Sequence, residues 1–231
     1  MPSKEYLQAE RNQPWREALR KTMKNKERTN LPRVKMPEQP PEARIHNFQE
    51  VNLGLTPELA LAESHRCLDC VNPTCIMGCP VEVNIPKFIK NIERGEILEA
   101  AKTLKETNTL PAVCGRVCPQ ERQCESQCFY VQKLKKEAVA IGYLERFAAD
   151  YEQESGNISI PETASANAIK IAVVGSGPAG LAFAGDMAKL GYEVTVFEAL
   201  HELGGVLRYG IPEFRLPNKT VDAEIEVLKK M

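Results

Sequence analysis

Eight cysteines, all that this 231-residue chain contains, lie in two short groups with the spacings C-x2-C-x4-C-x3-C-P and C-x3-C-P-x4-C-x3-C. The first group is Cys67, Cys70, Cys75 and Cys79, and the second is Cys114, Cys118, Cys124 and Cys128. Loops this short allow several thiolates to converge on one cluster. In bacterial two-cluster ferredoxins the cysteine before a proline binds the other cluster. Both groups contain a Cys-Pro step, so the pattern predicts two iron–sulfur clusters with ligands shared crosswise.

Zinc and disulfides are the alternative uses of clustered cysteines. Zinc sites usually pair two Cys-x2-4-Cys knuckles, and the additional Cys-x3-Cys-Pro elements fit that pattern less well. The start, MPSKEYLQAERN, is too polar for an export signal, so we expect a reducing cytoplasm, where structural disulfides are rare. Apolar runs such as IAVVG are too short to span a bilayer. Lys and Arg number 30 against 31 Asp and Glu, which gives no reason to expect a nucleic-acid partner.

A second motif, GSGPAG, has the glycine spacing G-x-G-x-x-G and comprises Gly175, Ser176, Gly177, Pro178, Ala179 and Gly180. The run IKIAVVG, which we expect to form a buried strand, precedes it, a helical pattern follows, and a second strand, YEVTVFE, ends at Glu198. In this context Gly175 permits a tight turn, Gly177 lets the backbone approach a pyrophosphate, and Gly180 lets the helix pack on the strand. The helix N-terminus would face the phosphates, and Glu198 would accept the ribose hydroxyls. An acidic residue at this position argues against NADP.

The elements that position these motifs form a helical unit and then the start of an α/β unit. We expect a charged, proline-rich arm over 1–44, an all-α domain over 45–153, a linker over 154–168, and the first β-α-β part of a Rossmann domain over 169–231. Two strands are too few for a parallel sheet, so we expect the sequence to be a fragment of a longer protein.

Local signals predict the individual helices. Thr56 caps a helix with Pro57 at its first position, and the apolar face of that helix is assigned to Leu59, Leu61 and Ala62. Asn84 caps a second helix, and helical patterns cover 96–106 and 136–151, so the cysteines are expected in loops between helices. In the arm, 14–28 has a helical pattern; both a solvated tail and a docking arm stay open.

The segments TNTLPAVCGRVCPQERQCESQC, VNLGLTPELALAESHRCLDC and IGYLERF closely resemble the small (β) subunit of NADPH-dependent glutamate synthase. Its relatives include the NADPH subunit of electron-bifurcating ferredoxin:NADP oxidoreductases and the N-terminal part of dihydropyrimidine dehydrogenase. The resemblance runs from about residue 32 to the end and leaves out the first thirty residues. It implies an α + α/β fold: a helical domain with two [4Fe-4S] clusters, followed by a Rossmann-like FAD-binding domain.

The resemblance also implies the ligands of each cluster. One cluster would be held by Cys67, Cys70, Cys75 and Cys128. The other would be held by Cys79, Cys118, Cys124 and Glu145, which stands where the family has Gln or Glu. Cys114 would then be a buried free thiol. Four plus four cysteines, with Glu145 as a surface carboxylate, stay open as the alternative because cysteine is the usual ligand.

After Glu198, the segment EALHELGG resembles the FAD half of two-dinucleotide flavoproteins, and GGVLRYGIPEFRLP matches the family signature. This match implies FAD contacts from Gly205, Val206 and Arg215. NADPH would bind a second Rossmann domain that this sequence does not reach. Because the family completes its FAD domain with later strands, we expect this chain alone to hold well below one FAD.

The resemblance implies an oxidoreductase that passes electrons from NADPH through FAD and two clusters to a partner redox subunit. The partner would be the glutamate synthase large subunit or, in a bifurcating oxidoreductase or pyrimidine reductase, a ferredoxin-type partner. No nucleic-acid or membrane partner is expected, and an oligomer stays open. No acid–base catalyst is predicted, because cofactors carry electron and hydride transfer. The alternative is a non-catalytic interaction module with zinc-stabilised helices; the intact glycine loop counts against it.

Overall fold

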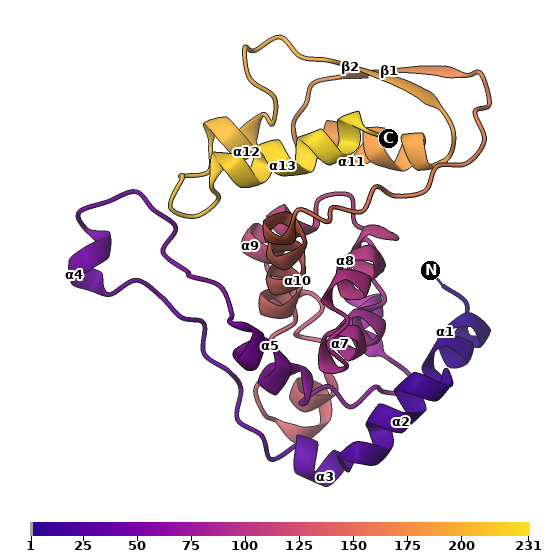
Figure 1. Ribbon diagram of the computed structural model, residues 1–231, viewed down its shortest axis with the longest axis vertical. Helices are drawn as coiled ribbons and strands as arrows, with labels where there is room; N and C mark the ends of the chain where they lie inside the picture. The colour runs from indigo at the N-terminus through magenta and orange to yellow at the C-terminus, as the bar shows by residue number, and fades with distance from the viewer. Residues whose placement is uncertain (1) are drawn as a thin grey trace.

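The protein, described over residues 2–231 of a computed structural model, has a helical part followed by an α/β part (Figure 1). The arm contains α1 (Lys4–Arg11), α2 (Pro14–Thr22), α3 (Asn25–Arg28) and α4 (Pro41–Arg44). The helical domain contains α5 (Pro57–Ser64), α6 (Thr74–Met77), α7 (Ile85–Glu93), α8 (Ile97–Lys105), α9 (Pro111–Val117) and α10 (Ile141–Ser155), with a 3-10 turn, η1 (Gln120–Arg122), and a π-helical turn, η2 (Tyr130–Leu134). The α/β part contains β1 (Lys170–Val174), α11 (Pro178–Lys189), β2 (Glu193–Phe197), α12 (Val206–Tyr209) and α13 (Asn218–Lys229). The predicted fold class is confirmed.

Side-chain caps start the helices that frame the first cysteine group. The hydroxyl of Thr56 accepts the backbone N–H of Leu59 at 3.3 Å, and Asn84 Oδ1 accepts that of Lys87, also at 3.3 Å. Each cap satisfies one of the otherwise unpaired amides of a first helical turn. These two helix starts are predicted correctly from the sequence.

The helix predicted over 136–151 begins later, at Ile141. The backbone groups that precede Ile141 form hydrogen bonds with side chains from another part of the chain. Arg66 donates to the carbonyl oxygens of Glu137 and Ala138 at 2.7 Å, and Ala140 N–H donates to Glu63 at 2.8 Å. These long-range bonds hold the segment extended and delay the helix.

Three other local predictions are wrong. Leu61 and Ala62, assigned to the buried face of α5, are exposed, because α5 turns Glu63 inward to pair with Arg66. Cys75 lies within α6 and Cys114 within α9, not in loops. The helical pattern over 14–28 is interrupted between α2 and α3, where Met23 is extended.

The core of the helical domain lies between α5, α7, α8 and α10. Phe88, Leu104 and Leu144 are completely buried there, and the partly buried thiols Cys75, Cys79 and Cys128 pack against the edge of this core. The cysteines therefore border the core and take their positions from it. Within residues 2–231 there is no helix with the length and apolar character that crossing a membrane requires.

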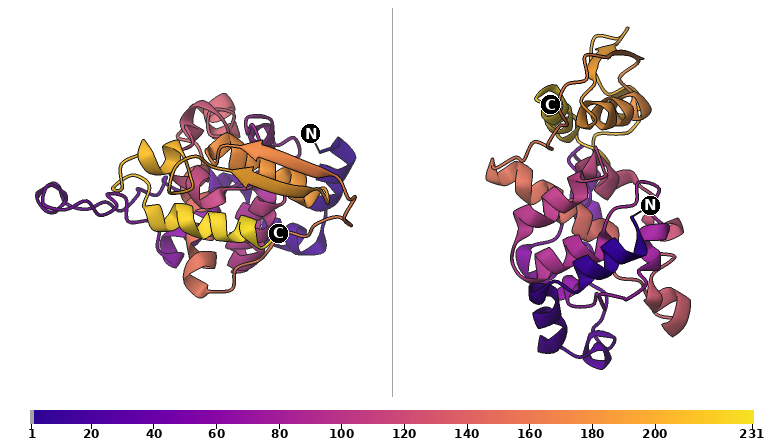
Figure 2. Two further views of the ribbon diagram at one scale, coloured as in Figure 1. Left: turned by 90° about the horizontal axis from the view of Figure 1, so that it is seen from above. Right: turned by 90° about the vertical axis from the view of Figure 1, so that its right-hand side faces the viewer.

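The α/β part pairs β1 and β2 in parallel, with Ala172 opposite Thr195. Helix α11 packs on both strands, and α11 and α13 lie between the sheet and the helical domain (Figure 1, Figure 2). The prediction that β1 is buried is wrong, because only one face of the two strands is covered among residues 2–231; Val174 is 89% exposed.

A second apolar cluster joins the two parts. Leu110 and Val113 of the helical domain pack with Leu181 of α11 and with residues of the segment that follows β2: Leu207, Leu216, Val221 and Ile225. Lys189 Nζ also donates to the carbonyl oxygen of Lys105 at 2.9 Å. The glycine loop and the cysteines are thus held in one packed structure.

Candidate functional site

The first candidate cluster site is a small cavity of about 30 Å³ whose wall includes four thiols: Cys67, Cys70, Cys75 and Cys128. The rest of its lining is largely apolar, with Ile89 from α7 and Val139 from the extended segment before α10. Cys128 reaches the cavity because Thr74, beside Cys75, donates its hydroxyl to the carbonyl oxygen of Gln127 at 2.5 Å. This bond ties the end of the second cysteine group to the middle of the first.

Burial disfavours ionisation of two thiols of this cavity. It raises the pKa of Cys70 to about 12 and that of Cys75 well above its ordinary value, and the neighbouring thiols Cys67 and Cys128 raise both further. Thiolates so close together repel one another, and a bound iron cluster would supply the opposing positive charge. Four convergent thiols, one buried and three partly buried, are the donor set that a [4Fe-4S] cluster takes.

The second candidate site is a cavity of about 140 Å³ lined by Cys79, Cys118 and Cys124 and by two further candidate ligands, Cys114 and Glu145. Helices α7, α9 and α10 supply part of its wall, and Phe88 closes its apolar side. Among residues 2–231, no three His, Cys, Asp or Glu side chains form a group that could hold a single metal ion. In both cavities the ligand candidates border a shared space.

Glu145 and Cys114 both line this cavity, and both contact the side-chain amide of Asn108. Asn108 Nδ2 donates to Glu145 Oε1 at 2.8 Å, and the Cys114 thiol lies 3.6 Å from Asn108 Oδ1. Burial raises the pKa of Glu145 to about 8, and the hydrogen bond from Asn108 only partly opposes this. Burial and the nearby Glu145 carboxyl raise the pKa of Cys114 as well. Glu145 is 8% exposed, so it is a buried group at the cavity, whereas the four-plus-four alternative expected a surface carboxylate.

The two cavities share a wall. Ile85 at the start of α7 and Ile141 at the start of α10 line both of them. Two cofactors held there would be separated by little more than apolar side chains.

The glycine loop has the backbone geometry that its sequence predicts. Gly175 has φ +95°, and a Cβ added at Gly180 would lie 2.0 Å from the carbonyl oxygen of Gly175, so a side chain there would push the helix off the strand. Nothing lies within 4 Å of a Cβ built on Gly177, which leaves the backbone open to a ligand. Pro178 begins α11, whose N-terminus points its free N–H groups at this space.

Glu198 lies beside this loop at the end of β2. One carboxylate oxygen accepts the backbone N–H of Ser176 at 2.8 Å and its hydroxyl at 2.5 Å, and the other accepts Leu200 N–H at 2.9 Å. These hydrogen bonds, led by the one from the Ser176 hydroxyl, lower the pKa of Glu198 to about 2. The carboxylate is therefore held ionised and aimed along the loop.

The predicted FAD contacts in the segment after Glu198 lie in two separate places. Gly205 lies against the glycine loop, since a Cβ added to it would lie 2.8 Å from Gly177 Cα, and Val206 follows it at the start of α12. Arg215 lies elsewhere: with Cys118 it lines a cavity of about 500 Å³ between the α/β part and the helical domain. One predicted FAD contact thus lies beside one predicted cluster ligand.

Sequence reasoning did not single out Asn108 or Asp69. Asn108 links Glu145 to Cys114, and Asp69 lies buried between Cys67 and Cys70. Neither role is visible in the cysteine spacing, because both depend on partners far along the chain.

Comparison with known proteins agrees with both parts. A family profile described as dihydropyrimidine dehydrogenase domain II, 4Fe-4S cluster, matches residues 44–157, and one described as NAD(P)-binding Rossmann-like domain matches residues 173–228. The chain therefore has an iron–sulfur domain followed by a Rossmann-like dinucleotide-binding part.

The curated relatives include two kinds of subunit. The chain is 39% identical over 202 residues to the glutamate synthase [NADPH] small chain of Escherichia coli K12, covering 87% of this chain and 42% of the relative. It is 40% identical over 184 residues to the NAD-dependent dihydropyrimidine dehydrogenase subunit PreT of Escherichia coli O157:H7, covering 80% and 44%. The chain spans less than half the length of these relatives. It belongs to the family of oxidoreductase subunits that includes the NADPH-dependent glutamate synthase small chain and this dihydropyrimidine dehydrogenase subunit.

Proposed function

We propose that this chain supplies the iron–sulfur and FAD-binding part of a cytoplasmic oxidoreductase of the glutamate synthase small-chain type. In the intact protein, electrons from NADPH would pass through FAD and two [4Fe-4S] clusters to a partner redox subunit. The observation that carries the proposal is the pair of thiol-lined cavities separated by Ile85 and Ile141. Such a pair suits two one-electron carriers in series.

The proposal assigns residues to each group, and the lining of the two cavities supports the assignment. Cys67, Cys70, Cys75 and Cys128 share the first cavity. The second would use Cys79, Cys118 and Cys124 with Glu145, whose carboxylate would replace a thiolate and change the charge of that cluster. The glycine loop and Gly205 would hold the FAD pyrophosphate, with Glu198 at the ribose and with Val206 and Arg215 as further contacts.

Two identities of the partner have nearly equal support. The PreT subunit is 40% and the glutamate synthase small chain 39% identical to this chain, and their names specify NAD and NADPH, respectively. A glutamate synthase large subunit and the acceptor of a pyrimidine reductase or bifurcating oxidoreductase are therefore both candidates. The chemistry carried by this chain is the same in each case.

The decisive experiment is the content of iron, acid-labile sulfide and zinc in protein purified without oxygen. We expect about eight irons per chain with matching sulfide, as two [4Fe-4S] clusters require. Cys70→Ser and Cys124→Ser should each remove the signal of one cluster, which assigns the two signals. Zinc without sulfide would refute the proposal and favour a structural metal module.

Two substitutions in the same oxygen-free protein test whether Glu145 or Cys114 is the eighth cluster ligand. Glu145→Ala should perturb the spectrum of the second cluster alone, while Cys114→Ser leaves both signals intact. The reverse result would make Cys114 the eighth ligand.

A further inference from the structure

We propose that the first part of the N-terminal arm, residues 2–30, positions the loop that carries Cys67 and Cys70 and that its arginines set the electrostatic environment of the first cluster. The inference rests on the proposed function in one respect, that these two cysteines are cluster ligands. The iron–sulfur family profile begins at residue 44, so the arm lies outside it.

The loop between the two cysteines has an unfavourable local structure. Asp69 is completely buried, and its φ of +50° is left-handed, a conformation that is costly for residues other than glycine. A buried carboxylate is tolerated only when it is paired, so this loop needs compensating charge from another part of the chain.

The arm supplies that charge. Arg20 Nη1 pairs with Asp69 Oδ2 at 2.6 Å, and Arg16 pairs with Oδ1. Arg11 Nε donates to the backbone carbonyl oxygen of Asp69 at 2.7 Å. Two cations of α2 therefore pair with the carboxylate and one cation of α1 binds the backbone of the same residue, so positive charges outnumber the single negative charge among these groups. Arg16 is buried, and its Nη1 has no hydrogen-bond partner among residues 2–231.

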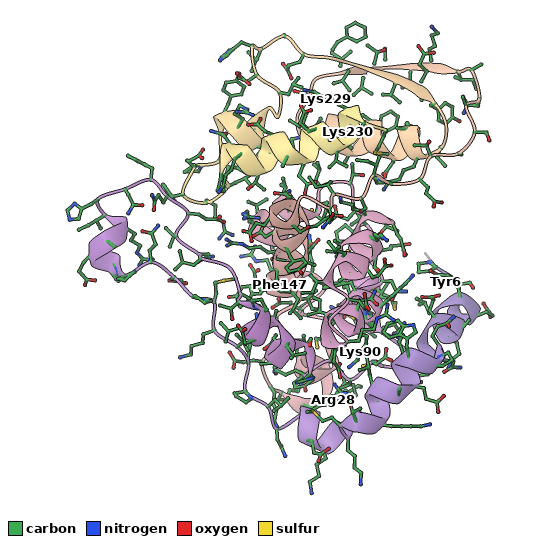
Figure 3. The ribbon with its side chains drawn as sticks, in the orientation of Figure 1. Tyr6, Arg28, Lys90, Phe147, Lys229 and Lys230 are labelled. Carbon is green, nitrogen blue, oxygen red and sulfur yellow. The ribbon has the colours of Figure 1, made fainter. Side chains whose placement is uncertain are left out.

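A second contact fixes the arm at the other side of the loop. Arg28 of α3 is buried and pairs with Glu93 at 2.7 Å, while one of its nitrogens donates to the carbonyl oxygen of His65 at 2.7 Å. Lys90 of α7 also pairs with Glu93 and donates to the carbonyl oxygen of Cys67 at 2.7 Å. Figure 3 shows Arg28 and Lys90 where α3 approaches α7. The backbone on both sides of Cys67 is thus tied to groups that the arm holds in place.

The arm also forms part of the surface beside this cluster. Cys70 lines both the first cavity and an outer groove of about 860 Å³, and Arg11 lines the same groove. Nearby positive charge stabilises the more negative, reduced form of a cluster, and exclusion of water changes its potential too. The arm is accordingly placed to act on the first cluster and not on the second.

The test compares the midpoint potentials of the two clusters, measured by redox titration with electron paramagnetic resonance. Arg16→Gln removes a cation and should shift the potential of the first cluster to more negative values. Asp69→Asn removes an anion and should shift it to more positive values, and Arg16→Lys should restore most of the original potential. Lys21→Gln is the matched control, because Lys21 is an exposed cation of the same helix whose ion pair is with Glu17 and not with Asp69.

Shifts of the midpoint potential in opposite directions in Arg16→Gln and Asp69→Asn, confined to the first cluster, would support the inference. Loss of the first cluster alone, seen as half the iron content, would support it too. If Arg16→Gln fails to fold, Arg11→Gln serves instead, because it removes a nearby cation without unpairing the buried carboxylate. Unchanged potentials in Arg11→Gln and Asp69→Asn, or equal shifts of both clusters, would overturn it. Metal analysis of the unaltered protein tests the proposed function separately, so the two failures are distinguishable.

Discussion

Replacing Glu224 by glutamine tests whether a buried carboxyl weakens the contact between the two parts of the molecule. Glu224 lies on α13, is 2% exposed, and accepts the backbone N–H of Ala112 on α9 at 2.5 Å. Burial raises its pKa to about 7; the Ala112 hydrogen bond and the positive charge of Lys105 oppose this, Glu152 adds to it, and Arg116 opposes it slightly.

The sign and size of the effect follow from linkage. The folded-state pKa of about 7 lies above the 4.5 of the unconstrained side chain, so the folded protein binds more protons than the unfolded chain. Below pH 4.5 the Glu224 carboxyl is uncharged in both states, and its contribution to the free energy of unfolding is fully present. That contribution is lost as the pH rises through about 7, because the buried group must then carry a charge. A pKa difference of about 2.5 corresponds to about 3 kcal/mol of unfolding free energy. Glutamine keeps an acceptor for the Ala112 N–H but cannot ionise, so the variant should avoid this loss.

The assay is urea unfolding without oxygen between pH 5 and 9. At pH 5, just above the unfolded-state pKa, Glu224→Gln should be more stable by about 1 kcal/mol, and at pH 9 by about 3 kcal/mol. Glu226→Gln is the control, because Glu226 is exposed on the same helix and pairs with Lys229. A difference that stays constant with pH, or a variant that is less stable at pH 9, would refute the reasoning.

Two further substitutions test the glycine loop and the helical core. Gly180→Ala places a Cβ against the carbonyl oxygen of Gly175, so we expect the free energy of unfolding in urea to fall by about 1–3 kcal/mol. Gly177→Ala is the control and should leave stability unchanged, because the space around its Cβ is open. Equal losses in the two variants would contradict the packing argument. Glu63→Ala leaves the buried guanidinium of Arg66 without its carboxylate, and should cost about 3–5 kcal/mol in the same assay; a loss below about 1 kcal/mol would show that the backbone carbonyls suffice.

Local signals in the sequence predict the elements but not the sets of ligands. Thr56, Asn84 and Pro178 mark helix starts because a cap or a proline acts on its own turn. Spacing predicts that the cysteine groups share clusters crosswise, whereas the assignment of Cys128 to the first cluster follows only from family resemblance. In the structure that placement depends on the bond from Thr74 to the Gln127 carbonyl, across 53 residues. No local pattern encodes such a bond.

The same limit explains the arm and the delayed start of α10. A charged segment such as 2–30 reads as solvent-exposed when its partners are unknown, yet Arg16 and Arg28 are buried by pairing with Asp69 and Glu93. Residues 136–140 have the apolar spacing of a helix, but Glu63 and Arg66 take their backbone groups. Buried ion pairs of this kind contribute to which structure forms more than to how stable it is.

The two cavities border different parts of the molecule. The second cavity is the one near the α/β part, since Cys118 also lines the space that contains Arg215. The first cavity lies at the arm, since Cys70 also lines the groove that contains Arg11. Helix α9, which lines the second cavity, also packs through Val113 against Leu181 of α11, the helix that begins at the glycine loop. Under the proposed function the second cluster would therefore be the one next to the α/β part, and the first cluster would be the one that the arm borders.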